Sequence, residues 1–135
     1  MKRKFGFTLL ELLVVISIIG ILMAMGAVAF SVAQKKGRDA RRMSDMKAIQ
    51  SAMEQYYAKS GAYAIQSTVE SSIGFIFPTD PKNTAPYVYS NTVDVALGTY
   101  CACANVEDNK GNSTSNACAF ISAGTGDFFC VKNLQ

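Results

Sequence analysis

The chain has 135 residues and a formal net charge of +3, and half of its residues are hydrophobic while only 17% are charged. That length allows one modest domain in addition to a hydrophobic segment, and the small charge gives no support for a nucleic-acid-binding domain. The complete absence of histidine excludes Ser-His and Cys-His nucleophile pairs, together with every zinc site that uses histidine.

A short basic stretch, residues 2–4, precedes an apolar segment whose one charged residue is Glu11. Residues 12–30 are all uncharged, which is enough for a helix to cross about 30 Å of hydrocarbon. A secretory signal peptide fits less well, because the apolar run exceeds the usual length of about 7 to 15 residues and no clear small-x-small cleavage site follows it. A plain membrane anchor is a second simple interpretation. Since a carboxylate in hydrocarbon costs about 2.5 to 3.5 kcal/mol, Glu11 needs a compensating role.

The helical pattern continues beyond the apolar segment. Apolar residues recur every three or four positions with charges between them, which predicts one amphipathic helix that ends near Ser60-Gly61. The predicted apolar positions are Ala40, Met43, Met46, Ile49, Met53 and Tyr56 or Tyr57. The charged pairs of this segment, Asp39 with Arg42 and Arg41 with Asp45, are expected on a solvated face.

The remainder of the chain predicts short strands. Three prolines within residues 78–86 indicate a loop that leads to a strand around residues 87–90. The alternating stretch 92–108, the CAFISA run 118–123 and the DFFCVKN run 127–133 predict further strands. We therefore predict an α+β fold, in which a long N-terminal helix carries a small antiparallel β-sheet head.

The four cysteines, Cys101, Cys103, Cys118 and Cys130, lie in the last 35 residues. An even number in a small, loop-rich domain behind a membrane segment predicts two disulfides and an oxidising compartment. A metal cluster is the alternative, but this spacing lacks the C-x2-C repeat of zinc and iron–sulfur sites, so we predict no metal and no cofactor. Because Cys101 and Cys103 share one face of a strand, each is expected to reach a different neighbouring segment. Three connectivities are possible, and we prefer Cys103 with Cys118 and Cys101 with Cys130.

The N-terminal stretch KFGFTLLELLVVISIIGIL, residues 4–22, resembles the N-terminus of type IV pilins and of the pseudopilins of type II secretion systems. The resemblance covers residues 2–30 and implies that a membrane-embedded prepilin peptidase cuts between Gly6 and Phe7 and methylates the new amino group of Phe7. A second stretch, FPTDPKNTAPYVYS, residues 77–90, is similar to a segment of the major pseudopilin of type II secretion and is a less specific match.

The resemblance implies a pilin, which is a structural subunit and not an enzyme. The expected organisation is a cleaved leader over 1–6, a hydrophobic membrane and filament-core helix over 7–30, an amphipathic continuation over 31–60 and a globular β-rich head over 61–135. The implied partners are further copies of the chain, the prepilin peptidase, the membrane before assembly, and an inner-membrane assembly platform with its ATPase. The alternatives are the major pseudopilin of a type II secretion system, a filament used for DNA uptake and, more remotely, a membrane-tethered extracytoplasmic binding domain.

Glu11 has an expected role in assembly. After cleavage Phe7 carries a positive amine, and Glu11 lies one turn, about 6 Å, further along the same helix face. We expect Glu11 to pair with the amine of an adjacent subunit, because assembly then removes two unpaired charges from hydrocarbon. The alternative is a carboxylate that reaches the lipid headgroups.

Two expectations concern a polar loop of the head. Its residues Glu107, Asp108, Asn109 and Asn112 have no EF-hand spacing, so a calcium site like that of the major pseudopilin is a minority alternative. Asn112-Ser113-Thr114 matches a glycosylation sequon in what is expected to be an exposed loop.

The charges that flank the apolar segment conflict with the implied orientation. Three basic residues precede the segment and five follow it, whereas positive charges normally mark the cytoplasmic side. We nevertheless expect a bitopic inner-membrane protein with a cytoplasmic N-terminus that later enters an extracytoplasmic or cell-surface filament, because disulfides need an oxidising exterior and the family's leader peptidase acts at the cytoplasmic face. The basic flank, Lys35, Lys36, Arg38, Arg41 and Arg42, is expected to face acidic heads of neighbouring subunits.

Overall fold

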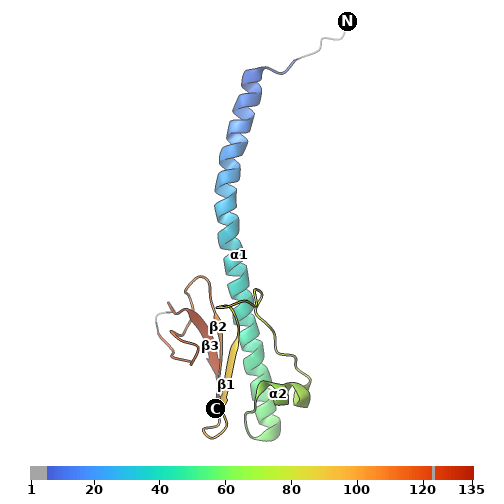
Figure 1. The fold of residues 1–135 in the computed structure, drawn as a ribbon, viewed down its shortest axis with the longest axis vertical. Coiled ribbons are helices and arrows are strands. Elements are labelled where there is room, and N and C mark those ends of the chain that lie inside the picture. The colour runs from blue at the N-terminus through green and yellow to red at the C-terminus, as the bar shows by residue number, and fades with distance from the viewer. Residues whose placement is uncertain (1–5, 123) are drawn as a thin grey trace. The chain divides into compact units, whose positions relative to one another are not determined.

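The computed structural model describes residues 6–122 and 124–135. In chain order the elements are α1 (Leu9–Ser60), α2 (Gln66–Ile73), β1 (Ser90–Asp94), β2 (Thr99–Asn105) and β3 (Phe128–Lys132), as Figure 1 shows. These elements confirm the predicted α+β class, with a long N-terminal helix and a small antiparallel sheet. The chain divides into two compact units, the first ending at Gln34 and the second beginning at Lys35, and α1 contributes residues to both.

The described part of the first unit is the apolar portion of α1 and the three residues before it. Every residue from Gly6 to Gln34 is exposed, and the large apolar side chains between Leu9 and Val32 are 44–82% exposed. By length and composition, α1 is able to cross a membrane. A helix that is apolar on every face has no side suited to water, so it requires lipid or other apolar helices around it.

The portion of α1 in the second unit has one buried face, as the periodicity predicts. Met46, Ile49 and Met53 are buried and belong to the core of the head. The first turn of this face differs from the prediction. Asp39 and Arg42 are buried, whereas the predicted apolar residues Ala40 and Met43 are exposed and half-buried, respectively. The expectation of a solvated face for the Asp39–Arg42 pair is therefore wrong.

The Arg41–Asp45 pair and the end of α1 lie as the sequence predicted. Arg41 lies 3.9 Å from Asp45 and its side chain is 65% exposed, which fits a solvated pair. The helix ends at Ser60, and Gly61 follows with φ +73°, a left-handed conformation that glycine adopts without strain.

A three-stranded antiparallel sheet in the order β1-β2-β3 packs on this part of α1. Tyr100, Ala102 and Ala104 of the central strand belong to the same core as the buried α1 residues. Because side chains alternate along a strand, Cys101 and Cys103 lie on the opposite face of the sheet. The sheet thus separates the apolar core from the cysteines.

Three local predictions differ from the structure. The strand expected around residues 87–90 begins only at Ser90, and the CAFISA run forms one isolated bridge at Phe120 instead of a strand. The helix α2 was not predicted, and Val69 of α2 is fully buried in the core. Its serine- and threonine-rich sequence has weak helix propensity, so tertiary burial decides its conformation.

The loop between β2 and β3 is fastened to the outer edge of β3. Gly111 and Gly126 exchange two backbone hydrogen bonds of 2.8 and 3.0 Å, and Ser113 exchanges two with Phe128. A Cβ atom on Gly126 would overlap the Ser113 backbone, so this close approach of two backbones requires glycine. The edge of β3 is consequently covered along these residues.

Candidate functional site

The helix start at Thr8 and Glu11 forms a capping box. Thr8 precedes the first helical residue, and its backbone N–H and its hydroxyl donate to Glu11 Oε2 at 2.9 and 2.8 Å. In return the Glu11 backbone N–H donates to Thr8 Oγ1 at 3.2 Å. This reciprocal pattern satisfies backbone donors that have no partner inside the helix. The Thr-x-x-Glu spacing is the local sequence signal for this cap.

The capping box gives the Glu11 carboxylate hydrogen bonds but no balancing charge. Within residues 6–122 and 124–135, Glu11 forms no ion pair. Gly6 and Phe7 lie immediately before the helix, and both are exposed. The structure therefore gathers the predicted cleavage, methylation and assembly residues in one short exposed segment.

A buried network of charges lies in the head, beside the first turns of α1 that belong to it. The guanidinium of Arg42 is fully buried and donates to Asp39 at 2.7 Å, to Asp80 at 2.6 and 3.1 Å and to Glu107 at 2.9 Å. Glu107 also accepts hydrogen bonds from Arg38 at 2.7 and 2.8 Å and from Lys82 at 2.9 Å. Three cations thus face three carboxylates, so their formal charges cancel.

These contacts change the acidity of two carboxyl groups. The hydrogen bonds from Arg38 are the largest cause that holds the pKa of Glu107 well below its ordinary value, and burial opposes them. Burial also acts to raise the pKa of Asp80, but the hydrogen bonds from Arg42 and from the backbone N–H of Lys82 outweigh it and lower the pKa. Both groups are therefore held in the charged form.

The charge network joins three separate segments of the head. Asp39 on α1 accepts hydrogen bonds of 3.0–3.1 Å from the backbone N–H groups of Glu107 and Asp108, which follow β2. Asp80 belongs to the loop before β1 and is tied to α1 through Arg42. Sequence reasoning missed this network because its partners are 38 and 65 residues apart along the chain.

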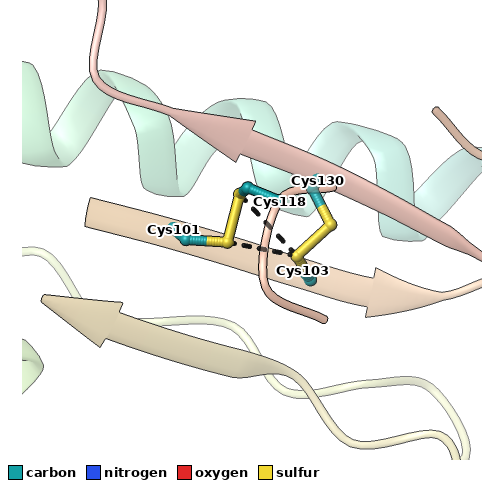
Figure 2. Close-up of side chains that lie close together, drawn as sticks. All are labelled: Cys101, Cys103, Cys118 and Cys130. Atoms are coloured by element: carbon teal, nitrogen blue, oxygen red, sulfur yellow. Dashed lines mark hydrogen bonds between the residues drawn. A yellow bond between two sulfur atoms is a disulfide. The ribbon is translucent and has the colours of Figure 1, made fainter. Parts of the chain in front are cut away.

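The four cysteines form two disulfides, Cys101–Cys118 and Cys103–Cys130, which Figure 2 shows. The preferred sequence-based pairing was the opposite one and is wrong. Cys103 lies directly across from Cys130 in the antiparallel register of β2 and β3, with a Cα–Cα distance of 4.1 Å. Cys118 reaches Cys101 because the loop between the strands folds over the sheet, and their Cα atoms are 5.9 Å apart.

Comparisons with known proteins agree with the N-terminal geometry. The family model described as a prokaryotic N-terminal methylation motif matches residues 1–27. The chain is also similar to the type IV major pilin protein PilA of Myxococcus xanthus (strain DK1622), with 33% identity over 73 residues, which is 54% of this chain and 32% of the relative. This chain thus spans about a third of the length of that relative. No solved structure matches the chain.

The methylation motif and the similarity to a major pilin both support the type IV pilin and pseudopilin family for this chain. Similarity to this family points to a structural subunit. The methylation motif and the apolar helix together fit a pilin anchored in the inner membrane.

The head offers little support for a calcium site in its polar loop. Glu107 is occupied by three cations, and Asp108 lies 3.2 Å from Lys110. In the described part of the chain, the group of residues close enough to share a metal ion consists of the four cysteines. Arginine and lysine thus occupy the place that a calcium ion would need to neutralise Glu107.

The asparagine of the sequon in the head is held by hydrogen bonds to β3. The Asn112 side chain donates to the Cys130 carbonyl at 2.8 Å and accepts from the Cys130 N–H at 2.7 Å, as a neighbouring strand would. Asn112 is half-buried, so the expectation of an exposed loop is wrong at this residue. Glycosylation of this nitrogen would break the donated bond and separate the loop from β3.

Proposed function

We propose that this chain is the subunit of a type IV pilus-like helical filament, assembled through residues 9–34 of α1 after cleavage between Gly6 and Phe7. The observation that carries the proposal is an apolar helix, exposed on every face, that begins with a carboxylate lacking a cation among the described residues. Self-association of such helices removes apolar surface from lipid or water and places several N-termini close together. The head then remains outside the packed helices.

In this proposal Glu11 has two successive partners. In the separate subunit its carboxylate accepts the hydrogen bonds of Thr8, which satisfy its oxygen but leave its charge unbalanced. In the filament it pairs with the methylated Phe7 amine of another copy. Pairing of opposite charges inside a low-dielectric core favours the assembled state and one axial offset between subunits.

We propose a cytoplasmic N-terminus and an extracytoplasmic head. The basic residues that follow the apolar segment would normally favour the opposite orientation. Two of them, Arg38 and Arg42, form ion pairs with carboxylates of the head, so they count less against it. Lys35, Lys36 and Arg41 then remain as the exposed basic residues of that flank. The partners proposed are the prepilin peptidase, the assembly platform and its ATPase.

A second candidate is the major pseudopilin of a type II secretion system. It is favoured by the similarity of residues 77–90 to that family, and Asp80 in this stretch is tied to α1 through the buried network. The mechanism of assembly is the same in both candidates. They differ in whether the filament extends beyond the cell surface.

Electron microscopy of material sheared from the native host, combined with N-terminal mass measurement, tests the proposal. We expect thin filaments that contain this chain beginning at a methylated Phe7. Filaments confined to the cell envelope would favour the secretion pseudopilus. A chain that retains residues 1–6, or that remains monomeric in the membrane, would contradict both candidates.

A further inference from the structure

The four cysteine sulfurs form one compact cluster and not two separate bridges. All four Sγ atoms lie within 4.8 Å of one another. Across the two disulfides, Cys103 Sγ is 3.5 Å from Cys101 Sγ and 4.0 Å from Cys118 Sγ (Figure 2). The sulfurs come from β2, β3 and the loop between them, so the fold brings together what the sequence spacing separates.

These distances resemble those of a tetrahedral thiolate site. Zinc binds sulfur at about 2.3 Å, so four sulfurs around one zinc ion lie about 3.8 Å apart. The two sulfur–sulfur distances between the disulfides, 3.5 and 4.0 Å, lie on either side of that value. To reach this arrangement, the two sulfurs of each disulfide must move apart. Rotation of the cysteine side chains allows this once the disulfide bonds are reduced.

We propose that the head, when its cysteines are reduced, binds one soft divalent metal ion such as Zn²⁺ through Cys101, Cys103, Cys118 and Cys130. Thiolates are soft ligands that select zinc over calcium or magnesium. The sequence spacing counted against such a site, but the strand register and the loop supply the proximity that spacing alone lacks. The disulfide form and the metal form use the same sulfurs and therefore exclude each other.

The two forms are related by a balanced redox step. A trialkylphosphine and one water molecule convert each disulfide into two thiols, and the phosphine becomes a phosphine oxide. Binding of Zn²⁺ by the four thiols then releases their four protons. In the opposite direction, two molecules of a small disulfide oxidant each accept two electrons and two protons and become thiols, while the four cysteine thiolates form the two disulfides and release the ion. A newly made chain carries four thiols, so metal binding requires no reductant at that stage.

Titration of the full chain in detergent tests this proposal. The chain is reduced with two or more equivalents of a phosphine without oxygen and is titrated first with Co²⁺ and then with Zn²⁺. We expect one equivalent of Co²⁺ to give the visible absorption of a tetrahedral thiolate complex and one equivalent of Zn²⁺ to displace it. The unreduced chain is expected to bind neither ion.

Two variants sharpen the titration. Cys101→Ser with Cys118→Ser leaves two sulfurs, so the affinity for Zn²⁺ should fall about 100-fold or more. Asp108→Asn removes a carboxylate of the same loop and should leave the metal affinity and the stoichiometry unchanged. Equal loss of affinity in both variants would assign the binding to the loop carboxylates and would overturn the proposal.

Reduction alone is expected to weaken the head, and zinc should restore it. One equivalent of Zn²⁺ should therefore raise the melting temperature of the reduced chain and recover its near-ultraviolet circular dichroism. Failure to bind one equivalent, or binding without any rise in melting temperature, would overturn the proposal. The titration does not require filaments, so its outcome leaves the proposed function unaffected.

Discussion

The two parts of α1 have the same secondary structure but depend on different contacts. Residues 9–34 are exposed on every face, and the capping box is their one described side-chain network that involves a charge. Residues 35–60 present one buried face, in which apolar residues and the fully buried Arg42 contact the rest of the head. The apolar side chains of residues 9–34 therefore need lipid or other subunits to cover them, whereas those on the buried face of residues 35–60 are covered by the head of the same chain. Substitutions in the head should therefore change its stability, and substitutions at the start of α1 should change filament assembly.

Arg42→Ala should produce the largest effect on the head. Removing the guanidinium leaves Asp80 and Glu107 buried with less compensation, and breaking such a network costs about 3–5 kcal/mol. Chemical denaturation of the mature chain in detergent measures this loss. Arg41→Ala is the matched control, and its cost should stay below about 0.5 kcal/mol because its pair is exposed. Similar losses in the two variants would contradict the central role of the buried network.

Removal of the bridge between β2 and β3 should rank next. Cys103→Ala with Cys130→Ala should lower the free energy of unfolding by about 2–5 kcal/mol. Peptide mapping of this variant should still detect the Cys101–Cys118 bridge. Recovery of Cys101 linked to Cys130 in the unaltered chain would contradict the pairing.

Acid should weaken the head through Glu107 and Asp80. Folding lowers the pKa of both groups, so the unfolded chain binds more protons than the folded chain below the ordinary carboxyl pKa of about 4. The free energy of unfolding should be nearly constant above about pH 5 and should decrease as the pH falls below about 4. Glu107→Gln should make this decrease shallower. A decrease of unchanged slope in that variant would exclude Glu107 as a source of the acid sensitivity.

Apart from the control variants, Tyr63→Phe should have the smallest effect on the head. The Tyr63 hydroxyl donates to the Glu54 carboxylate at 2.9 Å, and loss of one such bond to a charged group costs about 1.5–3 kcal/mol. Tyr56→Phe is the matched control, because its hydroxyl forms no hydrogen bond with the described residues. Thermal denaturation should separate the two variants, and equal melting temperatures would contradict a stabilising role for the Tyr63 bond.

Local sequence signals predicted much of this molecule. The length of the uncharged segment predicted the apolar helix, and Ser60-Gly61 predicted the end of that helix. The recurrence of apolar residues every three or four positions predicted the burial of Met46, Ile49 and Met53. The capping box was also present as the Thr8-x-x-Glu11 spacing. Each of these signals depends on residues within a few positions of one another.

Features that depend on distant residues were not predictable in the same way. Periodicity counts apolar residues, so it could not anticipate that Asp80 and Glu107 would make burial of Arg42 favourable. The disulfide pairing depends on strand register and on the path of the loop that carries Cys118. Both features arise only when the loops before β1 and after β2 reach their folded positions.

The most direct test of the account compares filament yield from Glu11→Gln and Thr8→Ala in the native host. Glutamine retains the acceptor of the capping box but removes the charge, whereas Thr8→Ala removes the cap and retains the charge. With membrane levels and leader cleavage equal, we predict that Glu11→Gln loses at least about 90% of its filaments, because the Phe7 amine then lacks its counter-charge. Thr8→Ala should retain most of them. Normal filaments from Glu11→Gln would contradict the claim that charge pairing at Glu11 drives assembly.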